Sequence, residues 1–153
     1  MPQIFVDADA CPVKDEVVKV AIRHDFPVTF VSNAFMRLPE DRLVTRRIVP
    51  EGPDAADDWI AEEVAASDIV VTNDIPLADR CLKKGALVIG GTGRDFTEAN
   101  IGSALASRAI SQHLREIGEM TGGPKGFSAK DRSAFLQAME RACRKAKREA
   151  SRR

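Results

Sequence analysis

The sequence contains few of the residues that build disulfide frameworks or structural zinc sites. It has three cysteines, at positions 11, 81 and 143, and two histidines, at positions 24 and 113. The cysteines are odd in number, and no two of them form a Cys-x-x-Cys pair. Secreted disulfide scaffolds and zinc modules need more of these residues at closer spacing. The sequence therefore favours a protein of the reducing cytoplasm.

Long apolar runs are also missing. No stretch is long enough to span a bilayer, and the first ten residues lack the basic segment of a signal peptide. With 44% hydrophobic and 30% charged residues, the composition is that of a soluble globular domain. We expect one domain over 1–153 with a βα core in 1–96, no membrane association and a cytoplasmic location. The sequence leaves the oligomeric state open.

The net charge is zero, but the charges are unevenly distributed. Residues 1–100 hold 11 basic and 18 acidic side chains, whereas residues 101–153 hold 12 basic and 5 acidic ones. One interpretation is two solvated faces of opposite sign. The other is an acidic site beside a basic surface that attracts phosphate backbones, which predicts a nucleic-acid partner, RNA in particular. Most of the positive charge lies in 141–153, whose last few residues are expected to fray.

Short apolar runs alternate with helical patterns along the chain. The runs predict strands at 4–6, 28–31, 47–49, 69–72 and 87–89. Apolar spacing, prolines and glycines predict helices over 12–25, 54–66, 76–84, 97–118 and from 128 onward. Continuous apolar strands are typical of a parallel sheet that is covered on both faces. The predicted fold class is α/β, with three α/β/α layers, a mainly parallel five-stranded sheet and the C-terminal helix pair as an appendage.

Aspartates stand where the first and fourth predicted strands end. Asp7 and Asp9 follow the first strand, and Asp74 follows the fourth. Parallel sheets bind ligands at the carboxyl ends of their strands, and strands one and four typically flank the point where the strand order reverses. Aspartate is also common in turns and caps. Three carboxylates in one crevice would repel one another without a counter-ion, however, which favours a shared site.

The helix predicted from Asp54 adds an independent candidate. Asp57 lies three residues before Ile60, on the apolar side of that helix, where an unpaired charge is costly. Asp54 lies about one turn earlier, as either a simple N-cap or a ligand. Asp58 is rotated away from this face and should be solvated.

A set of carboxylates without histidine or cysteine partners specifies a hard cation. Mg²⁺ or Mn²⁺ fits such a set, and zinc does not. One or two such ions suit phosphoryl chemistry, because they activate water and stabilise charge on the scissile phosphate. No histidine or lysine in these motifs is an obvious general base, so a metal-activated water would be the nucleophile.

Five motifs together resemble the YaiI/YqxD family of bacterial proteins: VDADACPVK at 6–14, GPDAADDWI at 52–60, TNDIPLA at 72–78, NIGSAL at 100–105 and GGPKGF at 122–127. That family is regarded as PIN-like, distantly similar to PIN ribonucleases and to 5′ nuclease domains. The resemblance covers nearly the whole chain. It implies a PIN-like fold and a nuclease-type metal site.

The resemblance assigns roles to particular residues. Asp7 matches the aspartate that closes the first PIN strand, and Thr72 with Asp74 matches a Thr/Ser-x-Asp motif after the fourth. The acidic helix start resembles that of 5′ nucleases, so Asp54, Asp57 and Asp58 compete for one or two ligand roles. The sequence departs from the pattern after Asp74. PIN and 5′ nuclease domains often have a further acidic residue one or two positions later, where this chain has Ile75 and Pro76, and Asp79 follows only on the helix.

The leading functional hypothesis is a metal-dependent hydrolase of nucleic-acid phosphodiesters, with RNA as substrate. The catalytic residues would be Asp7, Asp9 and Asp74. The expected ligands of Mg²⁺ or Mn²⁺ are Asp7, Asp57 and Asp74 with Asp9 and Asp54. The expected substrate contacts are Asn33, Thr72 and Arg47.

Two other functional hypotheses stay open. The Asp7-Ala-Asp9 spacing copies the DxD of phosphatases with an aspartyl nucleophile, although the lysine expected downstream is not evident. The proline at 76, in place of a carboxylate, favours a non-catalytic module that binds RNA or a nucleotide.

Overall fold

The computed structural model describes residues 1–9, 11–50, 52, 54–116 and 127–152, with side chains of 108–116 left out. Its central feature is a six-stranded sheet of order β3-β2-β1-β4-β5-β6. The strands are β1 (Ile4–Asp7), β2 (Val28–Ser32), β3 (Val44–Ile48), β4 (Ile69–Val71), β5 (Leu87–Ile89) and β6 (Asp95–Phe96). The helices are α1 (Lys14–His24), α2 (Ala55–Glu63), α3 (Ile75–Lys83), α4 (Glu98–Glu116) and α5 (Ala129–Ser151).

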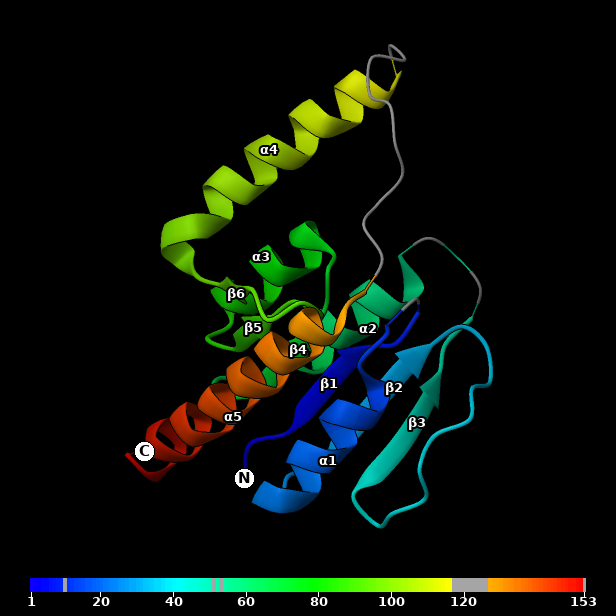
Figure 1. Cartoon of the computed structure of the whole chain (residues 1–153), viewed down its shortest axis with the longest axis vertical. Helices are drawn as coiled ribbons and strands as arrows, with labels where there is room; N and C mark the ends of the chain where they lie inside the picture. Colours follow the sequence, from blue (N-terminus) through cyan, green and yellow to red (C-terminus); the bar gives the residue numbers. More distant parts are fainter. Residues whose placement is uncertain (10, 51, 53, 117–126, 153) are drawn as a thin grey trace.

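The strand order places the reversal point between β1 and β4. The chain runs outward from β1 to β2 and β3, and then returns to β4 and β5 on the other side of β1 (Figure 1). These five strands are parallel, as predicted. The predicted count of five strands was wrong by one, because the two-residue β6 also joins the sheet and pairs antiparallel with β5. So short a strand has no apolar periodicity to reveal it.

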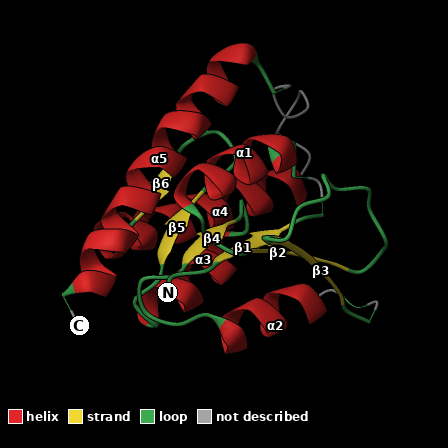
Figure 2. Ribbon diagram, turned by 90° about the horizontal axis from the view of Figure 1, so that it is seen from below, coloured by secondary structure: helices red, strands yellow, loops and turns green. Residues whose placement is uncertain are grey.

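Helices cover both faces of the sheet, which confirms the three-layer α/β/α class. Helices α1 and α5 pack on one face, and α2 and α3 on the other, where α4 packs against α3. Figure 2 shows α1 and α5 on one side of the sheet and α2 on the opposite side. Alternate residues of each strand feed the two cores. In β1, for example, Ile4 and Val6 face α1, whereas Phe5 lies in the core beneath α2.

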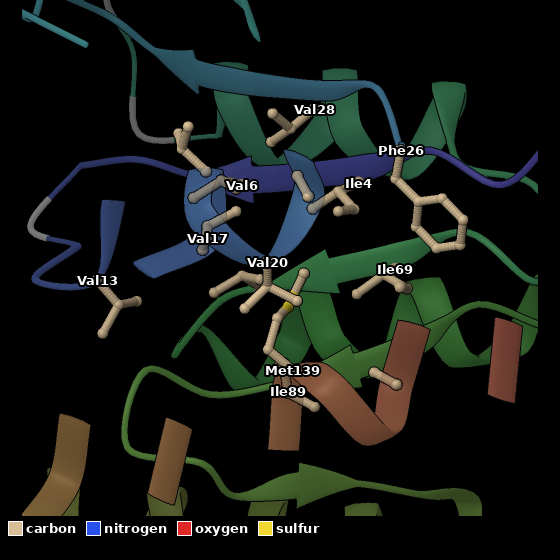
Figure 3. Packing of buried hydrophobic residues seen from close by; sticks show 14 of the residues in the cluster. Ile4, Val6, Val13, Val17, Val20, Phe26, Val28, Ile69, Ile89 and Met139 are labelled. Carbon is tan, nitrogen blue, oxygen red and sulfur yellow. The ribbon is translucent and has the colours of Figure 1, made fainter. Parts of the chain in front are cut away.

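Helix α5 is an integral part of the domain core, which corrects the expectation of an appendage. Its Phe135, Met139 and Cys143 are completely buried. In Figure 3, Met139 lies close to Val20 of α1 and Ile89 of β5. The helix starts with a capping box, in which Ser128 and Asp131 each accept a hydrogen bond from the other's backbone N–H. It remains helical to Ser151, so the fraying expected at the end of the chain is not seen up to that residue.

The remaining differences are in element lengths. Helix α2 ends at Glu63, three residues before the predicted end, because Val64 is already extended. Strand β3 starts at Val44, three residues before its predicted start. Across the described ranges, no helix is long and apolar enough to cross a membrane.

Candidate metal centre at the carboxyl ends of β1 and β4

Asp7 and Asp74 are brought together by the hydroxyl of Thr72. Asp7 ends β1, and Thr72 and Asp74 follow β4, its parallel neighbour. The Thr72 hydroxyl donates to Oδ2 of Asp7 at 2.9 Å and accepts from the backbone N–H of Asp74 at 3.0 Å. Asp74 is the N-cap of α3, where its Oδ1 accepts from the N–H of Leu77 at 2.9 Å. Asp7 and Asp74 are thus each oriented through one carboxylate oxygen.

These side chains line a small polar hollow of about 200 Å³ at the carboxyl ends of the strands. Its lining residues are Asp7, Asp9, Cys11, Val71, Thr72, Asn73, Asp74 and Gly91. Asp9 is held by Asn33, which follows β2: with its amide group turned to donate, the nitrogen lies 3.0 and 3.3 Å from the two oxygens of Asp9. Asn33, expected as a substrate contact, is therefore placed to position Asp9.

Asp57 faces the same carboxylates from α2. Burial raises its pKa to about 7, and repulsion by Asp74, Asp7 and Asp54 adds to the effect. When protonated, Asp57 hydrogen bonds to Asp74. Helical phase thus placed this residue on the correct side of α2. Asp54 occupies the N-cap position of α2, but its side chain makes no capping hydrogen bond.

The other two acidic candidates point elsewhere. Asp58 forms an ion pair with Arg80 at 2.8 Å, and its side chain is 57% exposed. Asp79 pairs with Lys83 at 3.0 Å, one turn further along α3. Neither is part of the carboxylate group around Asp7.

The pKa of Asp7 is raised by its surroundings. Burial raises the pKa of Asp7, the hydrogen bond from Thr72 opposes this shift, and repulsion by Asp74 and Asp9 adds to it. A bound cation would remove both the repulsion and part of the burial penalty. The donor atoms are all carboxylate oxygens, the ligands that Mg²⁺ and Mn²⁺ prefer. The chemistry of the donor set thus fits a hard divalent ion.

The spacing of the side chains is looser than that of a formed metal site. Across the described ranges, no three His, Cys, Asp or Glu side chains are grouped closely enough to hold an ion. Asp57 and Asp74 instead share a proton-mediated contact. An ion bound by all three aspartates would have to displace that proton and draw the side chains inward.

Sequence reasoning missed two residues beside the hollow. The side-chain oxygen of Asn73 accepts from the N–H of Gly91 at 2.8 Å and so ties the end of β4 to the β5–β6 connection. A Cβ at Gly90 would lie 3.0 Å from the same oxygen, so this glycine leaves room for Asn73. Lys14 donates to the carbonyl of Cys11 at 2.8 Å, which brings a cation to the edge of the site. The Asn within TND and the Lys closing VDADACPVK were the available signals.

The basic part of α5 lies away from the aspartates. Ser67, just before β4, donates to Glu149 of α5, so the end of this helix lies at the amino ends of the strands. Arg141, Arg144, Lys145 and Arg148 line a separate cavity of about 640 Å³ beside β5 and β6. The basic surface that reaches the carboxyl ends of the strands is instead on β3, where Arg47 lies over the Trp59 ring at 5.4 Å.

Asp57→Asn is expected to stabilise the metal-free protein at pH 8. The pKa of Asp57 is about 7 in the folded state, whereas the ordinary pKa of an aspartate is 3.8. The native aspartate therefore loses stability relative to asparagine as pH rises from about 4 through about 7. Because solvent screens this partly exposed group, we expect a gain of only about 1 kcal/mol at pH 8. Urea unfolding at pH 4.5 and 8 in EDTA measures it.

The matched control is Glu62→Gln, which removes an exposed carboxylate from the same helix. It should change the free energy of unfolding equally little at both pH values. An Asp57→Asn variant that is no more stable than the wild type at pH 8 would show that the Asp57 carboxyl is not under repulsion.

The fold and the crevice define the class of protein: an α/β/α domain with an acidic site at the reversal point of a parallel sheet. Residues 5–145 match the family described as an uncharacterized BCR, YaiI/YqxD family, and the chain belongs to that family. It is 58% identical over 146 residues to a UPF0178 protein of Agrobacterium fabrum, covering 95% of both chains.

Two further relatives have the same description. A UPF0178 protein of Rhodopseudomonas palustris is 55% identical over 146 residues, 95% of this chain and 94% of its own. One of a Caulobacter species is 55% identical over 148 residues, 97% and 98% of the two chains. No solved structure matches the sequence significantly.

Proposed function

We propose that the protein is a metal-dependent hydrolase of nucleic-acid phosphodiesters, with RNA as substrate and Mg²⁺ or Mn²⁺ as cofactor. The observation that carries this proposal is the convergence of Asp7, Asp57 and Asp74 from three separate elements, with a pKa of about 7 for Asp57. Structural carboxylates are normally paired with bases, whereas these face one another. The resemblance to PIN-like nucleases points to the same chemistry.

In this proposal Asp7, Asp57 and Asp74 hold the ion, and Asp54 neighbours them at the start of α2. The ion supplies Lewis-acid stabilisation of the phosphate and a lowered pKa for a coordinated water. Thr72 fixes the carboxylate of Asp7 in position. Asp9, held by Asn33, would take the proton of the attacking water as the new bond to phosphorus forms, while the bond to the leaving oxygen breaks and that oxygen takes a proton from solvent.

A cleavage assay tests the proposal. Purified protein is incubated with 5′-labelled single-stranded RNA and with DNA, in about 5 mM Mn²⁺ or Mg²⁺, enough to occupy a weak carboxylate site, or in EDTA. We expect RNA cleavage with Mn²⁺ or Mg²⁺ and none in EDTA. Intact RNA and DNA with both ions would contradict the nuclease proposal.

The same preparation separates two other functions. A non-catalytic RNA-binding module is favoured by the loose spacing of the carboxylates, and it predicts binding of RNA without cleavage in any ion. An aspartyl-nucleophile phosphatase predicts hydrolysis of p-nitrophenyl phosphate and a phosphorylated Asp7.

Thr72→Val is expected to weaken Mn²⁺ binding. Valine keeps the shape of threonine but cannot donate to Asp7 or accept from the Asp74 N–H. Losing such an outer-shell partner typically lowers metal affinity about 10- to 100-fold. Titration calorimetry with Mn²⁺ measures the change. Thr72→Ser keeps the hydroxyl and should bind like the wild type, whereas equal affinity of the valine variant would show that the Thr72 bridge does not support the ion.

A further inference from the structure

Phe35 is held outward on the loop that joins β2 to β3. The residue is 71% exposed. Both flanking carbonyls are fixed: the Ser32 hydroxyl donates to the carbonyl of Ala34 at 2.7 Å, and Nε of Arg46 donates to that of Met36 at 3.0 Å. Met36 itself packs against the core beneath α1. Single exposed apolar residues are common, but this ring is kept in solvent by an anchored backbone on either side.

Two arginines accompany aromatic rings on this edge of the sheet. The Arg46 guanidinium lies 5.0 Å from the centre of the Phe35 ring, and that of Arg47 lies 5.4 Å from the centre of Trp59. Both arginines are exposed on β3 and make no ion pair with any residue that the structure describes. Their charge is therefore available to a ligand. Successive residues of β3 point to opposite faces of the sheet. Arg46 pairs with Phe30, which lies in the core beneath α1, and Arg47 pairs with Val31, which lies in the core beneath α2. The two cations therefore lie on either side of the same sheet edge.

This surface lies next to the carboxylates. Arg47 pairs in register with Val31, which pairs with Asp7. Two strand spacings separate the backbones of Arg47 and Asp7, roughly 10 Å. The loop that carries Phe35 begins at Asn33, whose side chain holds Asp9. The edge strand β3 is thus separated from β1, which ends in Asp7, by β2 alone (Figure 1).

We infer that Phe35, Arg46 and Arg47 form a platform that binds a single-stranded nucleic acid and leads its backbone to the aspartates. An exposed aromatic ring stacks on an unpaired base, and the arginines contact the flanking phosphates. A duplex keeps its bases stacked on one another and cannot use the ring. The inference rests on the proposed function and names its substrate form: a single strand recognised by stacking, without preference for a base.

Charge favours this occupant over a protein partner. The candidate metal centre repels anions, so a polyanion needs cations beside it, and β3 supplies the cations nearest to Asp7 in the sheet register. The basic residues of α5 line a separate cavity beside β5 and β6, at the edge of the sheet opposite to β3. A second copy of the chain is the alternative occupant of the exposed Phe35.

The test is fluorescence anisotropy with a labelled 12-nucleotide oligo(U), oligo(dT) and a hairpin duplex, in EDTA so that no cleavage occurs. Twelve nucleotides are roughly the length that one single-strand binding site covers. We expect the wild type to bind both single strands more tightly than the hairpin. Phe35→Ala should weaken single-strand binding about tenfold, the loss of one stacked base. Phe35→Tyr should restore it to within about twofold, because the ring is kept.

The arginines have a separate readout. The Arg46→Gln/Arg47→Gln variant should lower the slope of log K against log salt by about 1.4, since each phosphate contact on a single strand contributes about 0.7. Ile22→Ala, which removes an exposed apolar side chain on α1, is the matched control and should leave binding unchanged. Equal affinity of Phe35→Ala and wild type, or an unchanged salt slope, would overturn the platform.

The outcomes separate this inference from the proposed function. Metal-dependent cleavage with normal binding by Phe35→Ala would overturn the platform and leave the nuclease intact. The expected binding pattern without cleavage would support the platform and overturn the nuclease. No binding of any oligonucleotide by the wild type would overturn the platform, as would a Phe35→Ala variant that changes only self-association in sedimentation.

Discussion

Asp7→Asn is expected to abolish Mn²⁺ binding and RNA cleavage together. Asparagine keeps the shape of the side chain and can still accept from the Thr72 hydroxyl, so the local structure should survive. What is lost is the negative charge at the centre of the carboxylate group. Loss of an outer-shell partner costs up to about 100-fold in metal affinity, and removal of a direct ligand should exceed that. Asp74→Asn should behave alike, because asparagine also caps helices well.

Metal binding, cleavage and unfolding should be measured in parallel for Asp7→Asn and for a control variant. Asp58→Asn is the matched control: it removes a carboxylate from the same region, but one that is paired with Arg80 in solvent. It should retain Mn²⁺ affinity and activity within about twofold. Cleavage that persists at wild-type rates in Asp7→Asn would place the chemistry elsewhere. Loss of activity in Asp58→Asn as well would point to a general charge effect.

Phe135→Ala is expected to cost the largest amount of stability. The side chain is completely buried on α5, in the core that α5 shares with α1 and the sheet. Truncation of a buried phenylalanine typically costs about 3–5 kcal/mol, from lost burial and from the cavity that remains. For a chain of this length, that corresponds to a fall in Tm of about 10 °C or more. Thermal and urea unfolding measure the change.

The control for Phe135 lies two residues away. Gln137 is exposed on the same helix, and Gln137→Ala should change the free energy of unfolding by less than about 0.5 kcal/mol. A Phe135→Ala variant as stable as this control would mean that α5 is the appendage that the sequence suggested. A large loss would confirm that α5 is part of the core that it shares with α1 and the sheet.

Most of the fold could be predicted from the sequence, and the predictions that were wrong have physical reasons. Apolar runs and turn residues identified the five parallel strands because each signal is local. The role of α5 was missed because it depends on small residues: Ala138, Ala142 and Ala146 are buried at a spacing of four. Alanines give a weak hydrophobic signal, yet they let α5 approach the sheet closely. Only the assembled core shows how well they are covered.

The site was predictable as far as topology and helical phase allow. Asp7 and Asp74 follow from the rule that strand ends meet at the reversal point, and Asp57 follows from its position before Ile60. The hydrogen bonds that position Asp9 and Asn73 could not be predicted from the sequence, because they depend on the register between strands. Asn33 reaches Asp9 only because β2 pairs in parallel with β1, and Asn73 reaches Gly91 only because β5 lies beside β4.

The most direct test is anomalous diffraction from crystals of the wild-type protein soaked in Mn²⁺ near pH 8, where Asp57 is ionised. We expect an anomalous peak among carboxylate oxygens of Asp7, Asp57 and Asp74, and no such peak in crystals of Asp7→Asn. Soaked wild-type crystals with no peak among these three side chains, or with Mn²⁺ bound only elsewhere, would contradict it.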